Sequence, residues 1–187
     1  MKMKYSTSEI RQILTKSSKE EKIRVIESLW NSNDPLVINL IIERLDDPEI
    51  TVRGESFSSL NLNENQIAEF LKTCLKHESE NVRGFCALIL ANRKEFDSIK
   101  DIIKLTNDPS AMVRSCALGA LGHMKANDAK ESIYNGLKDP DIEVKKSAIK
   151  AGIDIGDKNI LQSIQSFSSD EDSEIRKLVS EAIAKFS

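Results

Sequence analysis

The sequence contains few of the residues on which many active or structural sites depend. Its 187 residues include 3 Cys, 2 His and 1 Trp, and aromatic residues make up 5% of the chain. The cysteines, Cys74, Cys86 and Cys116, show no C-x-x-C spacing. This spacing speaks against a disulfide framework or a zinc knuckle and favours buried free thiols. Two histidines are too few for a multi-histidine metal site within one chain.

Glycine and proline are also scarce, with 7 and 4 residues, which favours a helix-rich fold over a sheet or a disordered chain. No Gly-rich phosphate loop is present; Gly119 and Gly122 fall in a helical pattern, where glycine allows close helix packing. No apolar run approaches the roughly 20 residues that span a bilayer, and the opening MKMKYSTSEI lacks the apolar segment of a secretory signal. We therefore expect a cytoplasmic protein without membrane association.

Neither sign of charge dominates the chain. The 27 basic and 30 acidic residues give a net charge of -3 and are spread evenly over both halves. A nucleic-acid-binding protein usually has a basic domain or stripe, and stacking of bases needs aromatic residues interleaved with basic ones. The sequence has neither feature, so we expect no nucleic-acid partner.

The main positive feature is an internal repeat. A β-branched residue followed by a base recurs at steps of 30, 31, 31 and 31 residues, at Val52-Arg53, Val82-Arg83, Val113-Arg114, Val144-Lys145 and Ile175-Arg176. Six positions before these bases stand Asp47, His77, Asp108, Asp139 and Asp170. A fainter copy precedes them at Ile23-Arg24. A fixed period of this length indicates a repeat architecture.

Each period contains two segments with the apolar spacing of an amphipathic helix. Start signals precede several first segments: Asp34 before Pro35, and Asn63 with Gln66 three residues later. One helix pair cannot bury its apolar faces alone, so the pairs should stack. The sequence predicts an all-α fold, a right-handed α-solenoid of about six antiparallel helix pairs. We expect a single domain, 1–187, with a degenerate N-terminal capping pair at about 6–31 and five repeats at about 34–187.

The motif Asp-Pro-x-x-x-Val-Arg followed by Ala-Leu-Gly, as in DPSAMVRSCALGALG at residues 108–122, resembles the HEAT repeat, in the short form of the phycobilin-lyase HEAT-like family. The resemblance implies a ladder of hydrogen bonds between successive turns. The physics agrees, because a turn carboxylate accepts backbone N–H groups and a guanidinium donates in several directions. The predicted structural ladder comprises Asp47, Arg53, Arg83, Asp108, Arg114, Asp139, Lys145, Asp170 and Arg176.

The second repeat departs from this pattern, because His77-Glu78 stands where Asp-Pro is expected. Either Glu78 or Glu80 substitutes as the acceptor, or the ladder is broken at this turn.

Enzymatic activity finds little support in the sequence. Deoxyhypusine hydroxylase, a HEAT-like enzyme, binds iron through His-Glu pairs just after the Val-Arg motif, and here those positions read, for example, Gly54-Glu55 and Ser115-Cys116. HEAT-like DNA glycosylases use a basic face with aromatic residues, which is also missing. No motif separates the chain from phycobilin lyases, and none singles out their activity. We predict no catalytic, cofactor or metal site.

A partner surface is expected on the second helix of each pair, which lines the concave face of such a solenoid. The positions two and six residues after the β-branched residue point away from the core. The candidate surface comprises Gly84, Leu88, Ser115, Gly119, Lys146 and Lys150. Small residues would allow close approach of a partner backbone, and the lysines would take an acidic group. The alternative is that the small residues only serve packing and the lysines form a solvated face.

The expected function is therefore a non-catalytic adaptor or scaffold, a monomer without cofactor that binds a protein or peptide on its concave face. The alternative is an accessory or chaperone-like lyase subunit for attachment of a bilin-type cofactor.

Overall fold

The computed structural model describes residues 5–186, and helices account for all of their regular structure. Twelve α-helices and five short 3-10 helices follow one another, and no strand occurs between residues 5 and 186. The predicted all-α class and the number of helices are confirmed. Met1–Lys4 and Ser187, the ends of the predicted 1–187 domain, lie outside the described residues.

The contacts within the chain divide it into two compact units, and the boundary lies inside one helix, α6 (Glu80–Asn92). Unit 1 spans residues 1–89 and unit 2 spans residues 90–187. The single-domain assignment made from the sequence stays a prediction.

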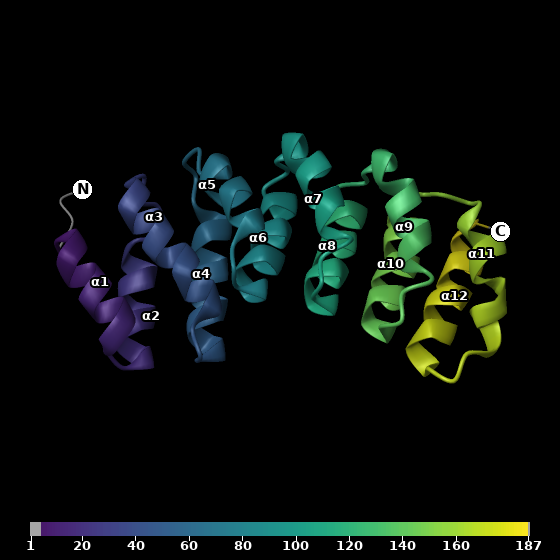
Figure 1. The fold of residues 1–187 in the computed structure, drawn as a ribbon, viewed down its shortest axis with the longest axis horizontal. Helices are drawn as coiled ribbons and strands as arrows, with labels where there is room; N and C mark the ends of the chain where they lie inside the picture. Colours follow the sequence, from purple (N-terminus) through teal and green to yellow (C-terminus); the bar gives the residue numbers. More distant parts are fainter. Residues whose placement is uncertain (1–4, 187) are drawn as a thin grey trace. The chain divides into compact units, whose positions relative to one another are not determined.

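Unit 1 is built from helix pairs joined by short turns (Figure 1). Its helix α1 packs against α2, α2 against α4, and α3 against α4 and α5. Its elements before α6 are α1 (Thr7–Lys16), α2 (Lys19–Ser28), α3 (Pro35–Ile42), η1 (Glu43–Asp46), α4 (Ile50–Leu62), α5 (Ala68–Thr73) and η2 (Cys74–Lys76).

Unit 2 continues the same alternation of a first and a second helix. The second helices α8, α10 and α12 pack side by side, and the first helices α7, α9 and α11 cover them. After α6 the elements are η3 (Phe96–Ser98), α7 (Ile99–Leu105), α8 (Ala111–His123), η4 (Asn127–Ala129), α9 (Lys130–Gly136), α10 (Ile142–Asp154), α11 (Ile160–Ile164), η5 (Gln165–Ser169) and α12 (Ser173–Phe186).

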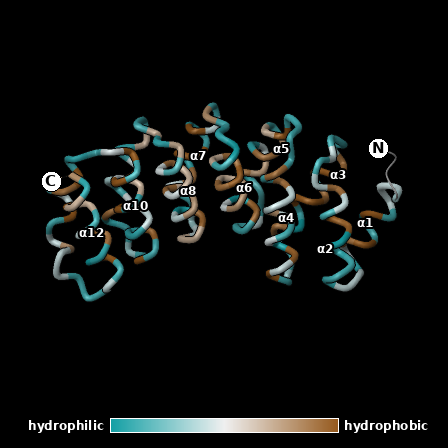
Figure 2. Tube along the Cα trace, turned by 180° about the vertical axis from the view of Figure 1, so that it is seen from behind, coloured by the Kyte–Doolittle hydropathy of each residue, from teal (hydrophilic) through white to brown (hydrophobic). Residues whose placement is uncertain are grey.

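The core of unit 2 follows the apolar spacing of the repeat. In α8 the side chains of Val113, Ala117 and Leu121 are fully buried, as the helical period requires of one face. Hydrophobic residues recur along α10 and α12, whereas the connections between helices are mostly hydrophilic (Figure 2). Burial of these faces against neighbouring helices is the driving force that stacks the pairs within the unit.

The start signals read from the sequence have mixed outcomes. Asp34 caps α3 by accepting from the N–H groups of Leu36 and Val37, with Pro35 at the first helical position, as predicted. Asn63, in contrast, ends α4. Its side-chain amide donates to the carbonyl oxygens of Trp30 and Ser32, at 2.9 Å each. Its Oδ1 accepts from the N–H of Asn65 in the turn before α5, and α5 begins only at Ala68, so the prediction of a start at Asn63 is wrong.

The two glycines of α8 differ in what surrounds them. A Cβ at Gly122 would lie 2.7 Å from Cα of Ala151 in α10, whereas a Cβ at Gly119 would meet nothing within 4 Å. The close-packing role expected for both glycines is confirmed for Gly122 and is wrong for Gly119.

This difference gives a matched stability test within one helix. We expect Gly122→Ala to lower the free energy of unfolding by about 1–3 kcal/mol, because the added methyl group forces the α8 and α10 backbones apart. Gly119→Ala should raise it by about 0.5–1 kcal/mol, because alanine is the better helix former and the space is open. Urea denaturation followed by circular dichroism measures both values. Equal effects of the two substitutions would contradict the packing described here.

Candidate functional site

Each predicted turn aspartate binds the backbone of its own turn. Oδ1 of Asp108 accepts from the N–H of Ser110 at 2.9 Å, and Asp139 and Asp170 accept in the same way from residues two positions ahead. Asp47 does so at 3.1 Å. A side chain that accepts from the N–H two residues on forms an Asx turn, which fixes the chain direction just before the second helix of the pair.

The base six residues later ties the helix back to this turn. Nη1 of Arg114 donates to the carbonyl oxygens of Asp108 at 3.0 Å and Pro109 at 3.2 Å. Arg53, Arg83 and Arg176 make the equivalent pair of bonds in their own turns. Within its own turn, each arginine therefore donates to backbone carbonyls and not to the aspartate side chain. The carboxylate can then also accept from a residue outside the turn.

Within unit 2, the Asp139 carboxylate is bound from the preceding repeat. Nε and Nη2 of Arg114 donate to its two oxygens at 2.8 and 2.9 Å, which is a bidentate pair with both side chains largely buried. This hydrogen bond from Arg114 is the main cause that holds the pKa of Asp139 below its ordinary value. Arg114 thus joins two turns, because it also holds the carbonyl of Asp108.

In unit 1 the corresponding link comes from a residue that the sequence reading missed. Nζ of Lys22 lies 2.8 Å from Oδ2 of Asp47, and both residues are buried. The faint motif at Ile23-Arg24 had placed the base two positions later, but Arg24 is exposed. The separation of 25 residues, which Lys22–Asp47 shares with Arg114–Asp139, is the signal that identifies Lys22.

Between the last two turns, a predicted surface residue makes the link. Lys145 is half-buried, and its neighbour Lys146 forms the ion pair instead, with Nζ 3.0 Å from Oδ2 of Asp172. Lys146 also pairs with Glu143 and Glu174 at 3.0 Å each. Glu174, followed by Asp172 and Glu143, raises the pKa of the Lys146 ammonium group above its ordinary value. The sequence predicted that Lys146 would bind an acidic group of a partner. In the structure its ammonium group is bound by three carboxylates of its own chain.

The second repeat keeps its turn although it lacks the aspartate. Nδ1 of His77 accepts from the N–H of Ser79 at 3.0 Å, so the imidazole replaces the carboxylate, and neither Glu78 nor Glu80 is needed for this bond. The other ring nitrogen, Nε2, lies 3.4 Å from Oε1 of Glu43. For Nδ1 to accept, the ring must carry its proton on Nε2, where it points toward this carboxylate.

A groove of about 330 Å³ lies between α10 and α12 on the surface of the second helices. Two predicted residues, Lys146 and Lys150, line it. The lining also includes Lys177 and Glu181, which occupy the same positions in the last repeat, and the helical period brings all four side chains to one side. The full lining comprises Glu143, Lys146, Ser147, Lys150, Glu174, Lys177, Leu178 and Glu181.

Charges of both signs are arranged along this groove, and most are paired. Lys177 lies 3.9 Å from Glu181, and Lys146 is enclosed by its three carboxylates. Lys150 is exposed and takes part in none of the ion pairs found among residues 5–186. It is therefore the lysine of the groove that is available to an outside anionic group.

The other predicted surface residues lie outside the groove. Gly84 is buried, which differs from its expected position on the surface, and Leu88 is half-buried. Oγ of Ser115 lies 2.8 Å from Oγ of Ser147, a hydrogen bond between α8 and α10. Gly119 is partly exposed, with open space above it.

Searches for two further kinds of site found nothing in the described part of the chain. No group of three or more His, Cys, Asp or Glu side chains there could hold a metal ion. None of the helices within residues 5–186 is both long and apolar enough to cross a membrane.

Known proteins are similar to this chain in the repeat of its sequence and in its fold. Residues 67–137 match the family model for HEAT repeats. The complex of CpcE and CpcF of phycocyanin lyase from Nostoc sp. PCC7120 has a similar fold, with a TM-score of 0.66 and 18% identity over 83% of this chain and 67% of that chain. A designed armadillo repeat protein in complex with the peptide (KR)4 gives a TM-score of 0.57 and 16% identity, over 98% and 100% of the two chains.

An engineered protein is similar over 96% of both chains, with a TM-score of 0.56 and 17% identity. No curated protein matches the chain in sequence. Identities this low show the fold alone. The predicted resemblance is confirmed: residues 67–137 match the model for HEAT repeats, and the fold of the chain is similar to that of phycocyanin lyase and armadillo repeat proteins.

The link between Arg114 and Asp139 generates a stability prediction. We expect Arg114→Ala to lower the free energy of unfolding by about 2 kcal/mol, because it removes two charge-assisted bonds and two bonds to carbonyls. In a double-mutant cycle with Asp139→Asn, the coupling energy should be about 1 kcal/mol. Arg176→Ala is the matched control, because Arg176 is seen to donate only to carbonyls of its own exposed turn. If Arg176→Ala lowered the free energy of unfolding by as much as Arg114→Ala, the larger contribution expected from the Arg114–Asp139 pair would be contradicted.

The same pair predicts a dependence on pH. A carboxylate with a lowered folded-state pKa contributes stability above its unfolded pKa, about 3.9, and loses it as the pH falls through the folded value. The stability difference between the wild type and Arg114→Ala should therefore shrink between about pH 5 and pH 2. On the Asp139→Asn background, which lacks the main carboxylate partner of Arg114, the effect of Arg114→Ala should change much less over this range, because only the weaker interactions with Asp108 and Asp141 remain to titrate. Urea titrations at each pH measure both differences.

Proposed function

We propose that the chain is a non-catalytic adaptor that binds an extended polypeptide along the second helices of unit 2, with the groove between α10 and α12 as a main contact. The observation that carries this proposal is the groove itself, which is lined almost entirely by charged side chains from two adjacent helices. Pockets for small molecules are mostly apolar, with few polar groups. A polypeptide, in contrast, offers side chains and backbone groups of both polarities.

The ion pairs around Lys146 support this role by preparing the groove in advance. Glu143 and Glu174 are exposed, yet their carboxylates are fixed on the Lys146 ammonium group at 3.0 Å each. Side chains that are already ordered lose less freedom when a partner binds. Lys150 then offers a free positive charge for an acidic side chain of the partner.

The fold also supports the binding of a peptide, although it does not identify one. The designed armadillo repeat protein of similar fold is in complex with the peptide (KR)4. That peptide is basic, whereas the free charge in the groove of this chain, Lys150, is positive. The partner proposed here therefore differs in chemistry and carries at least one acidic residue for Lys150.

A lyase-like accessory role is the second candidate, and the fold similarity to the CpcE–CpcF complex of phycocyanin lyase favours it. A cofactor-attachment site of this kind should offer a deep apolar pocket for a small molecule. The groove between α10 and α12 has only Leu178 as an apolar side chain in its lining. The character of this groove supports the polypeptide over the small molecule.

The proposal is tested by selecting ligands from a displayed library of random peptides with the full chain as bait. We expect the selected peptides to contain an acidic residue. Lys150→Glu should weaken the best peptide about tenfold, equivalent to about 1.4 kcal/mol, in isothermal titration calorimetry. Lys158→Glu reverses an exposed charge outside the groove and serves as the matched control, with unchanged affinity expected. Selection of no peptide, or equal affinity of both variants, would refute the proposed site.

A further inference from the structure

Two of the three cysteines occupy positions of one repeat that face each other across its helix pair. Cys74 lies in η2 and is half-buried, while Cys86 lies in α6 and is fully buried. Two periods of 31 residues further along, the same positions are held by Gly136 and Ala148. A Cβ built on Gly136 would lie 3.0 Å from Cβ of Ala148. The repeat therefore brings the Cβ atoms of these two positions close together.

This separation at the glycine position is somewhat shorter than that in a disulfide. In disulfides the two Cβ atoms are typically about 3.5–4.5 Å apart. The glycine of the later repeat allows its backbones to approach more closely than two side-chain-bearing residues would. Cys74 and Cys86 both carry a Cβ, so we expect their spacing to be wider and to fall in the range that a disulfide needs.

The two thiols of the reduced protein already interact. A hydrogen bond between them lowers the pKa of Cys74, although burial opposes this, and raises the pKa of Cys86 well above its ordinary value. The more exposed sulfur is thus the one more readily converted to a thiolate, which is the reactive form toward oxidants. The thiol of Cys86, which is the more buried of the two, stays protonated beside Cys74.

We propose that Cys74 and Cys86 form a redox-sensitive modification site, at which a hydroperoxide converts the two thiols into an intramolecular disulfide. The Cys74 thiolate attacks one oxygen of the peroxide, the O–O bond breaks, and Cys74 becomes a sulfenic acid while the other oxygen leaves as hydroxide, or as the alkoxide of an organic peroxide. The sulfur of Cys86 then displaces the sulfenic hydroxyl group, which takes the Cys86 proton and leaves as water. The two sulfurs are oxidised by two electrons in all, and the peroxide is reduced.

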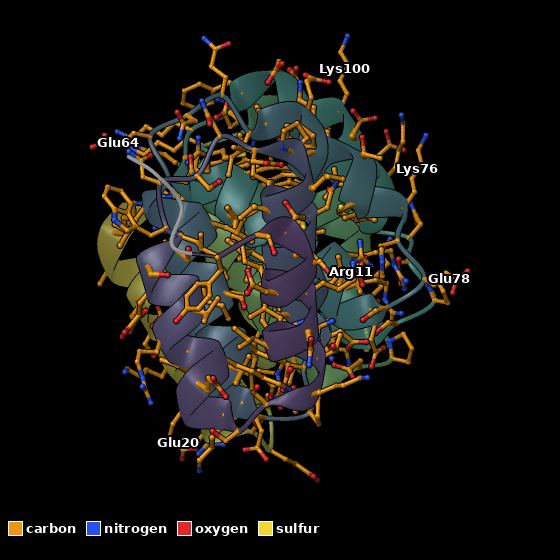
Figure 3. All side chains as sticks on the ribbon, turned by 90° about the vertical axis from the view of Figure 1, so that its left-hand side faces the viewer. Arg11, Glu20, Glu64, Lys76, Glu78 and Lys100 are labelled. Atoms are coloured by element: carbon orange, nitrogen blue, oxygen red, sulfur yellow. The ribbon has the colours of Figure 1, made fainter. Side chains whose placement is uncertain are left out.

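The disulfide would close a short loop around the turn that leads into α6. This turn contains His77, and its exposed side chains Lys76 and Glu78 extend outward from the ribbon (Figure 3). The cross-link joins the helical segment before the turn to the helix after it, so the turn becomes fixed from both sides. No movement of the buried Cys86 to the surface is required, because the attack takes place between neighbouring sulfurs.

Cys116 provides an internal reference for this chemistry. Burial raises the pKa of its thiol to about 11, and its Sγ lies 3.6 Å from Sδ of Met112. A thiol that stays protonated near neutral pH reacts slowly with oxidants.

The test is oxidation of the full chain with hydrogen peroxide, followed by alkylation, trypsin digestion and mass spectrometry. We expect residues 73–76 joined to residues 84–93, with a mass lower by two hydrogens than the sum of the two peptides. Treatment with a reducing agent should restore both thiols. In the oxidised protein, Cys116 should remain available for alkylation after unfolding.

Variants separate the proposed steps. Cys86→Ala places at this position the alanine found in two other repeats, Ala117 and Ala148, so the fold should persist, which circular dichroism checks. In this variant Cys74 should stop at the sulfenic acid and be labelled by dimedone. Cys74→Ser should abolish the disulfide, and Cys116→Ser should leave its yield unchanged. A disulfide that includes Cys116, a disulfide between two chains as the main product, or oxidation of Cys74 without linkage to Cys86 would overturn the proposal.

Discussion

The arrangement of unit 2 depends on the bidentate pair in which Arg114 of one repeat holds the carboxylate of Asp139 in the next. Apolar burial drives helix pairs together but has no direction, so it does not by itself fix how far one pair slides along another. The pair supplies this direction, because both side chains are already anchored. Arg114 is bound to the carbonyl of Asp108, and Asp139 holds the N–H of Asp141. Two turns are thereby connected through one guanidinium group.

The same principle operates with different residues at other steps. Lys22 serves Asp47 in unit 1, and Lys146 serves Asp172 at the end of unit 2. A lysine ammonium group is a single point charge on a flexible stem, whereas a guanidinium forms two parallel bonds with a carboxylate. The lysine links therefore restrict geometry less than the Arg114 link does.

The period of the sequence was sufficient to predict the helix pairs, because burial at positions such as Val113 and Ala117 follows directly from helical spacing. The identity of the contacts was harder to predict. A helical wheel shows which way a side chain leaves the helix, but it does not show how far a long side chain reaches. For this reason Lys146 was assigned to the outer surface, although its stem extends across to the next turn.

Substitutions within the motif were a second limit on prediction. His77 does not look like a carboxylate in a sequence pattern, yet a neutral imidazole presents one acceptor nitrogen at a suitable distance and keeps the turn. Asn63 matched a helix start, but its amide donates to the carbonyls of Trp30 and Ser32, and its Oδ1 accepts in the turn before α5. In both cases the hydrogen-bonding capacity of the side chain, and not its usual place in a motif, decided its role. The partners of such a side chain are known only when the positions of the neighbouring turns are known.

Stability and the proposed recognition depend on the same residues at the end of unit 2, which limits the substitutions that the groove can accept. Lys146 both links two turns and orders the carboxylates of Glu143 and Glu174 at the groove, so its replacement disturbs the fold and the proposed binding surface together. Lys150 lies one helical turn further along α10. It is exposed and takes part in none of the ion pairs found in the described part of unit 2. Lys146 and Lys150 lie on one face of α10. A partner would therefore meet one ammonium group that is held by carboxylates of this chain and one that is not. Specificity in this groove is therefore expected to depend on Lys150 and on the equivalent positions of α12 more than on Lys146.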